Sequence, residues 1–230
     1  MKLGYIKSLI LSLIFCVQYA HAENLSDIEM PLFDVMSGMK TEWVAEKMVY
    51  NGHPMSIQNF MSNRNSKDVM RHFESKWKVK GLGELKYQVV GDEFTLGFVN
   101  NGYSYSVQSR DIPGGSVGSL VVTRDKIFSQ SDIKFPIQPN AHVVSRIHSL
   151  DLGVRSETIT LSSYHSASMN KQWYRSQLPR NGWVGMGNTM KLQGSVLEYQ
   201  KGKQMCQITF INKSPVREHR SMVLIHWIKG

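Results

Sequence analysis

The chain has 230 residues, of which 41% are hydrophobic and 20% are charged, and its formal net charge is +9 at pH 7. This composition excludes a wholly disordered chain, a collagen-like repeat and a small disulfide-stapled domain. The length is sufficient for one or two domains, each with its own hydrophobic core.

The first 22 residues have the pattern of a secretory signal peptide. Lys2 and Lys7 provide a basic start, an apolar stretch covers 9–17, and small residues follow it. That stretch is too short for a membrane-spanning helix, which needs roughly 20 residues. We therefore predict a signal peptide over 1–22 and a periplasmic or secreted mature chain without a later transmembrane segment. A retained signal remains the alternative.

A weak internal repeat relates the two halves of the chain at an offset of 101 residues. In the first half, apolar residues at three- and four-residue spacing, which include Phe73 and Trp77, predict an amphipathic helix. At the same offset, Tyr174 and Leu178 predict a second helix. We interpret this pattern as a duplicated module.

Strand patterns flank each predicted helix. Tyr103, Tyr105 and Val107 alternate with polar residues, and the preceding Asn101–Gly102 is a strong hairpin signal. Further strands are predicted over 55–60, 85–90, 119–123, 157–161 and 222–228. The predicted fold class is therefore α+β, with two tandem related modules that each consist of an antiparallel sheet covered by one helix.

The predicted domain order follows from these patterns and from a proline-containing tract without periodicity. It comprises a signal peptide (1–22), an N-terminal arm (23–41), a first module (42–125), a linker (126–140) and a second module (141–230). The first module has ten basic and nine acidic residues, whereas the second has twelve basic and four acidic residues. The second module is therefore expected to be strongly cationic.

This excess of positive charge predicts a surface for an anionic partner. The candidate binding residues are Lys171, Arg175, Arg180, Lys191, Lys201, Lys203, Arg217 and Arg220. The alternative is a solvated face that only promotes solubility. A nucleic acid is the less favoured partner, because Trp183 and Tyr199 are the only stacking candidates near the charge, and the alternation turns Tyr199 inward.

The sequence predicts no catalytic residue, metal site or cofactor. The histidines of the mature chain lack zinc-site spacing, and Cys206 is the only cysteine after signal removal. Cys206 is expected to be buried with its neighbouring strand, although an intermolecular disulfide is the alternative. Gly114, Gly115 and Gly118 lie between two predicted strands, so we expect a turn there and not a phosphate-binding loop.

These features together favour an exported, non-enzymatic binding or assembly subunit of a bacterial cell-envelope complex, such as a secretion, pilus or transfer apparatus. One alternative is a binding protein for an anionic envelope polymer or lipid. Another is an enzyme whose site forms between the two modules.

Overall fold

The computed structural model of the chain describes residues 24–79, 83–128, 132–191 and 194–230, so the predicted signal peptide lies outside the described residues. A short 3-10 helix, η1, covers Leu25–Asp27. The remaining elements up to residue 124 are β1 (Lys40–Tyr50), β2 (His53–Ser62), α1 (Ser66–Val79), β3 (Glu84–Val90), β4 (Glu93–Asn100), β5 (Tyr103–Ile112) and β6 (Gly115–Arg124).

The second half has the same order of elements: two strands, a helix and four strands. These elements are β7 (His142–Asp151), β8 (Val154–Ser163), α2 (Ala167–Arg180), β9 (Val184–Lys191), β10 (Gly194–Lys201), β11 (Gln204–Ile211) and β12 (Ser221–Lys229). The tract between β6 and β7 has no helix or strand within its described residues.

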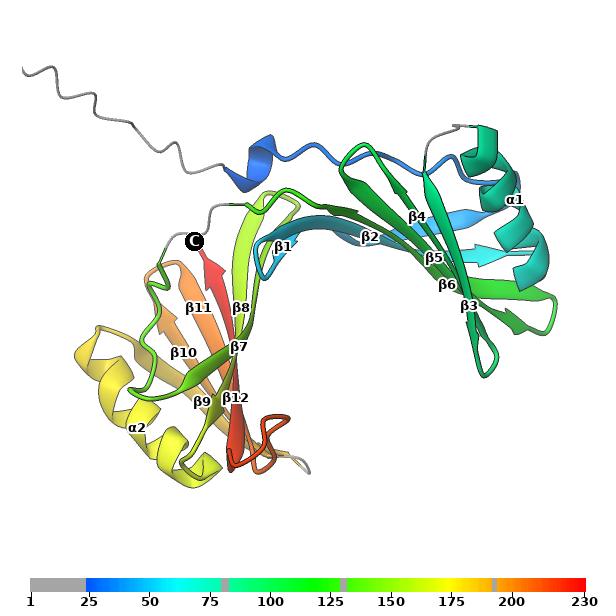
Figure 1. Ribbon diagram of the computed structural model, residues 1–230. Helices are drawn as coiled ribbons and strands as arrows, with labels where there is room; N and C mark the ends of the chain where they lie inside the picture. The colour runs from blue at the N-terminus through cyan, green and yellow to red at the C-terminus, as the bar shows by residue number, and fades with distance from the viewer. Residues whose placement is uncertain (1–23, 80–82, 129–131, 192–193) are drawn as a thin grey trace, which may run out of the picture.

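All twelve strands belong to one antiparallel sheet, in the order β3-β4-β5-β6-β2-β1-β7-β8-β12-β11-β10-β9. The two halves meet where β1 pairs with β7, from Lys47 opposite Leu150 to Tyr50 opposite Ile147. Just beyond these pairs, the Asn51 side chain accepts a hydrogen bond from the Arg146 backbone N–H at 2.8 Å. The sheet bends into an arch at this central seam (Figure 1).

The predicted fold class is therefore wrong. The protein is a mostly antiparallel β structure with one continuous sheet, and it is not a pair of α+β modules with separate sheets. The described part of the chain contains only two α-helices, one on each end of that sheet. The backbone hydrogen bonds between β1 and β7 overturn the prediction, because they join the strands of both halves into a single ladder.

Local predictions agree better with the structure. The helices lie where apolar spacing placed them, and Ser66 and Ser166 stand at their starts. Asn101 and Gly102 have φ values of 49° and 75°, as the predicted hairpin turn requires. These features depend on neighbouring residues alone, which explains why their positions could be predicted.

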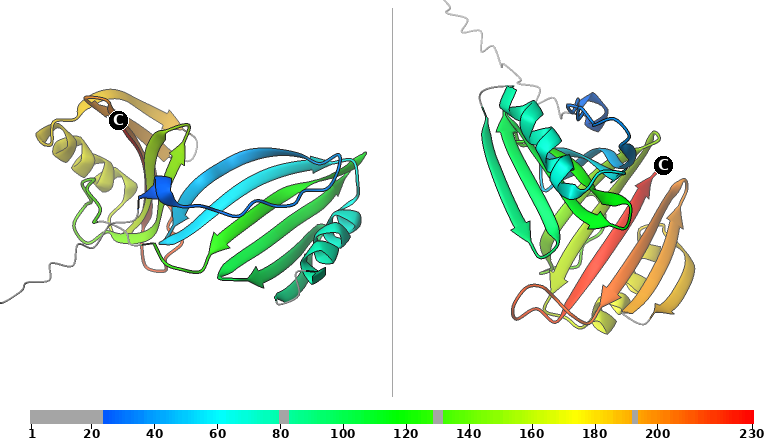
Figure 2. Two further views of the ribbon diagram at one scale, coloured as in Figure 1. Left: turned by 90° about the horizontal axis from the view of Figure 1, so that it is seen from above. Right: turned by 90° about the vertical axis from the view of Figure 1, so that its right-hand side faces the viewer.

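All three hydrophobic clusters lie on the same face of the sheet, the face that carries both helices. Phe73 and Trp77 of α1 pack there on one end, and Tyr174 of α2 packs on the other. Between them, Leu25 and its neighbours in the N-terminal arm cover Val49 of β1. Figure 2 shows this arm running along the outer side of the arch from η1 toward α1. The opposite face, here called the concave face, carries no helix (Figure 1).

Candidate binding surface

The centre of the concave face is formed by strands on both sides of the seam. Side chains alternate along a strand, and residues that pair across an antiparallel ladder share a face. Ile57 pairs with Val121, and both point away from the buried Phe60 and Leu120. By the same register, eight apolar residues gather on the concave face and are here called the central band: Met48, Tyr50, Met55, Ile57, Met61, Val117, Val121 and Ile147.

The central band is accessible to a partner. Met61 is 57% exposed and Tyr50 is 42% exposed, whereas Ile57 and Val121 are half-buried by their strand neighbours and Met48 is buried. None of the eight residues belongs to a hydrophobic cluster of the described chain. The band is thus an apolar surface that the rest of the fold leaves uncovered.

The residues that border the central band are mostly small and uncharged. Ser149 and Ser156 hydrogen-bond to each other at 2.7 Å, and Ser119 donates to the Gln108 side chain at 3.4 Å. The register places three charged residues beside the band: Lys40 and Glu42, at the start of β1, and Arg110 of β5, which pairs with Val117. The centre of the concave face is therefore nearly neutral, in contrast to the cationic total of the chain.

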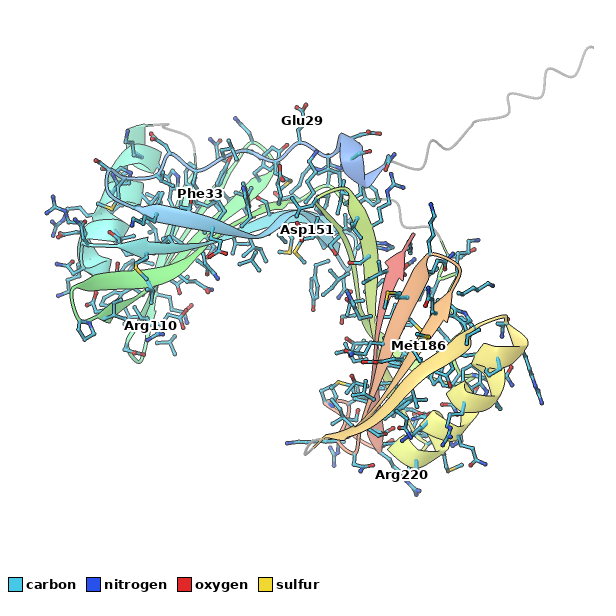
Figure 3. The ribbon with its side chains drawn as sticks, turned by 180° about the vertical axis from the view of Figure 1, so that it is seen from behind. Glu29, Phe33, Arg110, Asp151, Met186 and Arg220 are labelled. Carbon is cyan, nitrogen blue, oxygen red and sulfur yellow. The ribbon has the colours of Figure 1, made fainter. Side chains whose placement is uncertain are left out.

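Two hollows flank the band on the concave face. The first, with a volume of about 440 Å³, is lined by residues that include Glu93 and Arg110, which pair across β4 and β5. Figure 3 labels Arg110 in the first half and Met186 in the second. The second hollow, of about 480 Å³, is lined by Met186, Met205 and Ile228 among others.

The predicted basic residues do not form one patch. Lys171 and Arg175 border a shallow depression on the outer side of α2. Lys201 donates a hydrogen bond to the Asn181 carbonyl at 2.8 Å, which holds the β10–β11 turn against the end of α2. The structure therefore brings Arg180, Lys201 and Lys203 to one end of the second half.

The remaining candidates lie elsewhere. Arg217 and Arg220 belong to the loop that joins β11 to β12 (Figure 3 labels Arg220), at the other end of β11 from Lys203. An eight-residue strand separates these two ends by roughly 26 Å. The side chain of Lys191 lies outside the described part of the structure. A small anion could therefore contact either group but not both.

The aromatic candidates for base stacking are buried. Trp183 is 5% exposed and packs on Phe135 at 5.5 Å between ring centroids, and Tyr199 is 7% exposed, so its predicted inward orientation is confirmed. Cys206 is also buried, as predicted, and burial raises the pKa of its thiol to about 12. The second half thus presents no stacking platform at these positions.

A buried charged cluster lies on the helix-bearing face and was missed as a unit by the sequence analysis. Glu157 is fully buried and accepts hydrogen bonds from Arg146 Nε at 2.6 Å and Lys229 Nζ at 2.5 Å. Burial opposes ionisation of Glu157, but the hydrogen bonds and charges of Lys229 and Arg146 outweigh it and lower the pKa. Burial also lowers the pKa of the neighbouring His148 to about 4. The cluster ties β7, β8 and β12 together beside the seam.

Comparison with known proteins gives one partial similarity. Residues 32–129, less than half of the chain, match the family described as peptidase S7, the flavivirus NS3 serine protease. No curated protein and no solved structure matches the chain significantly. In this structure the matched segment comprises part of the N-terminal arm, β1 to β6 and α1.

A serine protease needs a serine hydroxyl hydrogen-bonded to a histidine that a carboxylate orients. Within the described residues of 32–129, no serine hydroxyl hydrogen-bonds to His53 or His72. Instead, His72 Nε2 lies 3.1 Å from the backbone carbonyl of Asp34. The matched segment therefore shows no assembled triad.

The segment Gly114–Gly118 has the G-x-S-x-G spacing of a nucleophile elbow, which the sequence analysis overlooked. Its Ser116 is fully buried in β6, and its hydroxyl donates a hydrogen bond to the Arg64 carbonyl at 2.8 Å. A nucleophile elbow is a strand-to-helix turn, whereas this segment turns from β5 into β6. The Ser116 hydroxyl therefore ties the start of β6 to the segment between β2 and α1, and its burial removes it from contact with a substrate.

Within the described residues of the second half, one serine hydroxyl hydrogen-bonds to a histidine ring. Ser162 Oγ lies 2.7 Å from His219 Nδ1, and the His219 ring packs against Tyr164 at 4.1 Å between ring centroids. Ser162 is fully buried, and no carboxylate hydrogen-bonds to His219 in the described residues. The pair anchors the β11–β12 loop on the sheet, and it lacks the accessible hydroxyl and the orienting carboxylate of a catalytic triad.

The described residues also contain no group of three side chains suited to hold a metal ion. None of the helices within this part of the chain has the length and apolar character needed to cross a membrane.

Proposed function

We propose that the protein is an exported, non-enzymatic binding or assembly subunit of a bacterial cell-envelope complex, and that the central band binds a protein partner. The observation that carries this proposal is an apolar, nearly uncharged band on the one face of the sheet that nothing in the described chain covers. Interface cores are depleted in charge and enriched in methionine and aromatic residues, and exposed apolar patches mark binding surfaces.

The envelope part of the proposal depends on the pattern of residues 1–22. Export predicts that the periplasmic fraction contains a chain that begins at Glu23, which the intact mass of the purified protein would show. A full-length chain confined to the cytoplasm would contradict export and leave the binding proposal standing.

Site-specific photo-crosslinking in the source organism tests the binding surface. A photoreactive residue at Ile57 or Val121 should give the same adduct with one envelope protein. The control is Leu152, which is 98% exposed at the β7–β8 turn and should not give it. Met61→Asp should abolish the adduct without lowering the thermal unfolding temperature, because this side chain lies at the surface. The proposal fails if no adduct forms at the band, or if Leu152 gives the same adducts.

A second candidate function, binding of an anionic envelope polymer, is favoured by the end of the second half. Arg180 and Lys203 make no ion pair among the described residues and lie beside Lys201. The variant with Arg180→Gln and Lys203→Gln should elute from a heparin column at lower salt than the wild type. The matched control carries Arg217→Gln and Arg220→Gln, which remove the same charge from the other end. Equal shifts in both variants would indicate diffuse attraction only.

A further inference from the structure

The two edges of the sheet differ in how they are protected. The outer strands are β3 and β9, and each has a strand neighbour on one side only among the described residues. In the second half, α2 lies against β9, and a register shift at Tyr199 interrupts the pairing of β9 with β10. In the first half, α1 packs on β4, β5 and β6 instead. The edge at β3 is therefore the open one.

The edge strand β3 has few of the features that prevent pairing with another chain. It has no bulge in its register with β4 and no proline, and its charged residues are the exposed pair Glu84–Lys86. Tyr87 is 56% exposed and Val89 is 49% exposed, both on the side of the strand that faces α1. An unpaired and apolar edge of this kind is a template for an added strand.

A groove lies directly beside this edge. Its volume is about 510 Å³, and it lies between α1 and the strands β3 and β4. Met70 and Leu96, each 3% exposed, form its floor, and Leu85 and Tyr87 form the wall on the β3 side. The groove therefore offers an apolar site in line with the free backbone of an edge strand.

The charges at the groove restrict its occupant. On α1, four basic residues outnumber two acidic ones, and Lys76 pairs with Asp34 of the N-terminal arm at 2.9 Å. Arg71 pairs with Asp68 and Glu74 pairs with Lys78, whereas Lys67, which also lines the groove, makes no ion pair in the described part of the chain. A second copy of the chain would bring another cationic α1 toward the first across the new seam. An acidic segment complements this edge better than a second copy does.

We propose that the groove between α1 and β3 binds an extended peptide segment of a partner protein, which pairs with β3 as a thirteenth strand. Apolar side chains at alternate positions enter the groove, and an acidic residue on the same face reaches Lys67. Main-chain hydrogen bonds supply affinity, and the alternate side chains supply specificity. This inference rests on the proposed binding function but uses a surface separate from the central band.

The probe is the fluorescein-labelled synthetic peptide Glu-Thr-Val-Thr-Val-Thr-Glu, which presents valine and glutamate on one face of an extended strand. Fluorescence anisotropy should show saturable binding to the wild-type protein at micromolar to sub-millimolar concentration. Replacing both glutamates with lysine should weaken binding at least fivefold, and proline at the central position should abolish it. Hydrogen exchange should slow at the backbone amides of 84–90.

Two variants on the same strand provide the matched comparison. Tyr87→Asp places a charge in the groove and should weaken binding at least tenfold. Val90→Asp places the same charge on the concave face of β3, where the side chain is 64% exposed, and should change binding less than twofold. Thermal unfolding of both variants confirms that they fold.

Three results would overturn the inference: no binding at 1 mM peptide, equal effects of Tyr87→Asp and Val90→Asp, or a dimer in sedimentation that Tyr87→Asp dissociates. The last result would identify a second copy as the occupant. The central-band variant Met61→Asp should leave peptide binding unchanged. If no adduct forms at Ile57 but the peptide binds, the proposed function fails and this inference stands. If the adduct forms but the peptide does not bind, this inference fails and the proposed function stands.

Discussion

Replacement of Glu157 with glutamine tests whether the buried cluster at the seam stabilises the sheet. Glutamine preserves the shape of the side chain but leaves Arg146 and Lys229 around a neutral amide. Removal of one partner from a buried ion pair costs about 3–5 kcal/mol, because the remaining charge stays desolvated. The Lys229 side chain is 32% exposed and can turn toward water, so we expect a loss near the lower bound, about 3 kcal/mol.

Thermal and urea unfolding, followed by far-ultraviolet circular dichroism, measure this loss. In a chain of this size 1 kcal/mol corresponds to about 2–4 °C, so the midpoint should fall by about 6–12 °C. The control is Glu84→Gln, which breaks the exposed pair with Lys86 at 3.3 Å and should cost at most about 1 kcal/mol. Equal effects of the two substitutions, or a loss below 1 kcal/mol at Glu157, would refute the reasoning.

The same cluster predicts a dependence on pH. The pKa of Glu157 is lower in the folded protein than its ordinary value, so the unfolded chain binds the proton more tightly. The stabilisation by ionised Glu157 is therefore complete above the ordinary pKa and is lost as the pH falls through the folded-state pKa. The difference in unfolding free energy between the wild type and Glu157→Gln should shrink on acidification.

Three further predictions concern other buried groups. The folded-state pKa of His148, about 4, lies below its ordinary value of 6.5, so the free energy of unfolding should fall as the pH drops from 6.5 to 4. Urea titrations at several pH values should show a weaker dependence on pH for His148→Asn than for the wild type. Cys206 should react with a thiol reagent only after unfolding, since fast modification of the native protein would contradict its burial. Gly118→Ala should destabilise the protein by about 2 kcal/mol, because the new Cβ would lie 1.9 Å from the Gln108 carbonyl oxygen, whereas Gly97→Ala meets only ordinary contacts.

The sequence predicted the elements that neighbouring residues determine. The spacing of Phe73 and Trp77 predicted α1, and Asn101–Gly102 predicted the hairpin between β4 and β5. The alternation at Cys206 also predicted its burial. The helix and the hairpin result from contacts within a few residues, and the inward orientation of Cys206 follows from the alternation of its strand, so each leaves a local pattern in the sequence.

The seam between the halves leaves no such pattern. In β1, register shifts between Trp43 and Ala45 and between Ala45 and Met48 interrupt the alternation of side chains. In β7, a shift between Val143 and Ser145 has the same effect. Neither strand was predicted, and without them the two halves were interpreted as separate sheets. The internal repeat and the domain boundaries remain predictions.

The candidate site was only partly accessible to sequence reasoning. A strand over 55–60 was predicted, but apolar residues occupy both of its faces, with Ile57 on one and Phe60 on the other. The sequence could not show which face the helices would cover. The eight basic residues drew attention to the second half of the chain, although the uncovered apolar surface lies across the seam.

The composition of the central strands supports the binding proposal independently of any partner. In β6, Leu120, Val121 and Val122 form a continuous apolar run, and runs of this kind are typical of strands that are buried on both faces. The protein covers one face only: Leu120 and Val122 are buried beneath the helix-bearing side, while Val121 stays on the concave face. Met222 to Ile225 repeat the arrangement in β12, since Val223 and Ile225 are buried and their neighbours face the other way. These strands have the composition of strands that are covered on both faces, but this fold covers only one of their faces. Their composition therefore favours a second protein that covers the concave face.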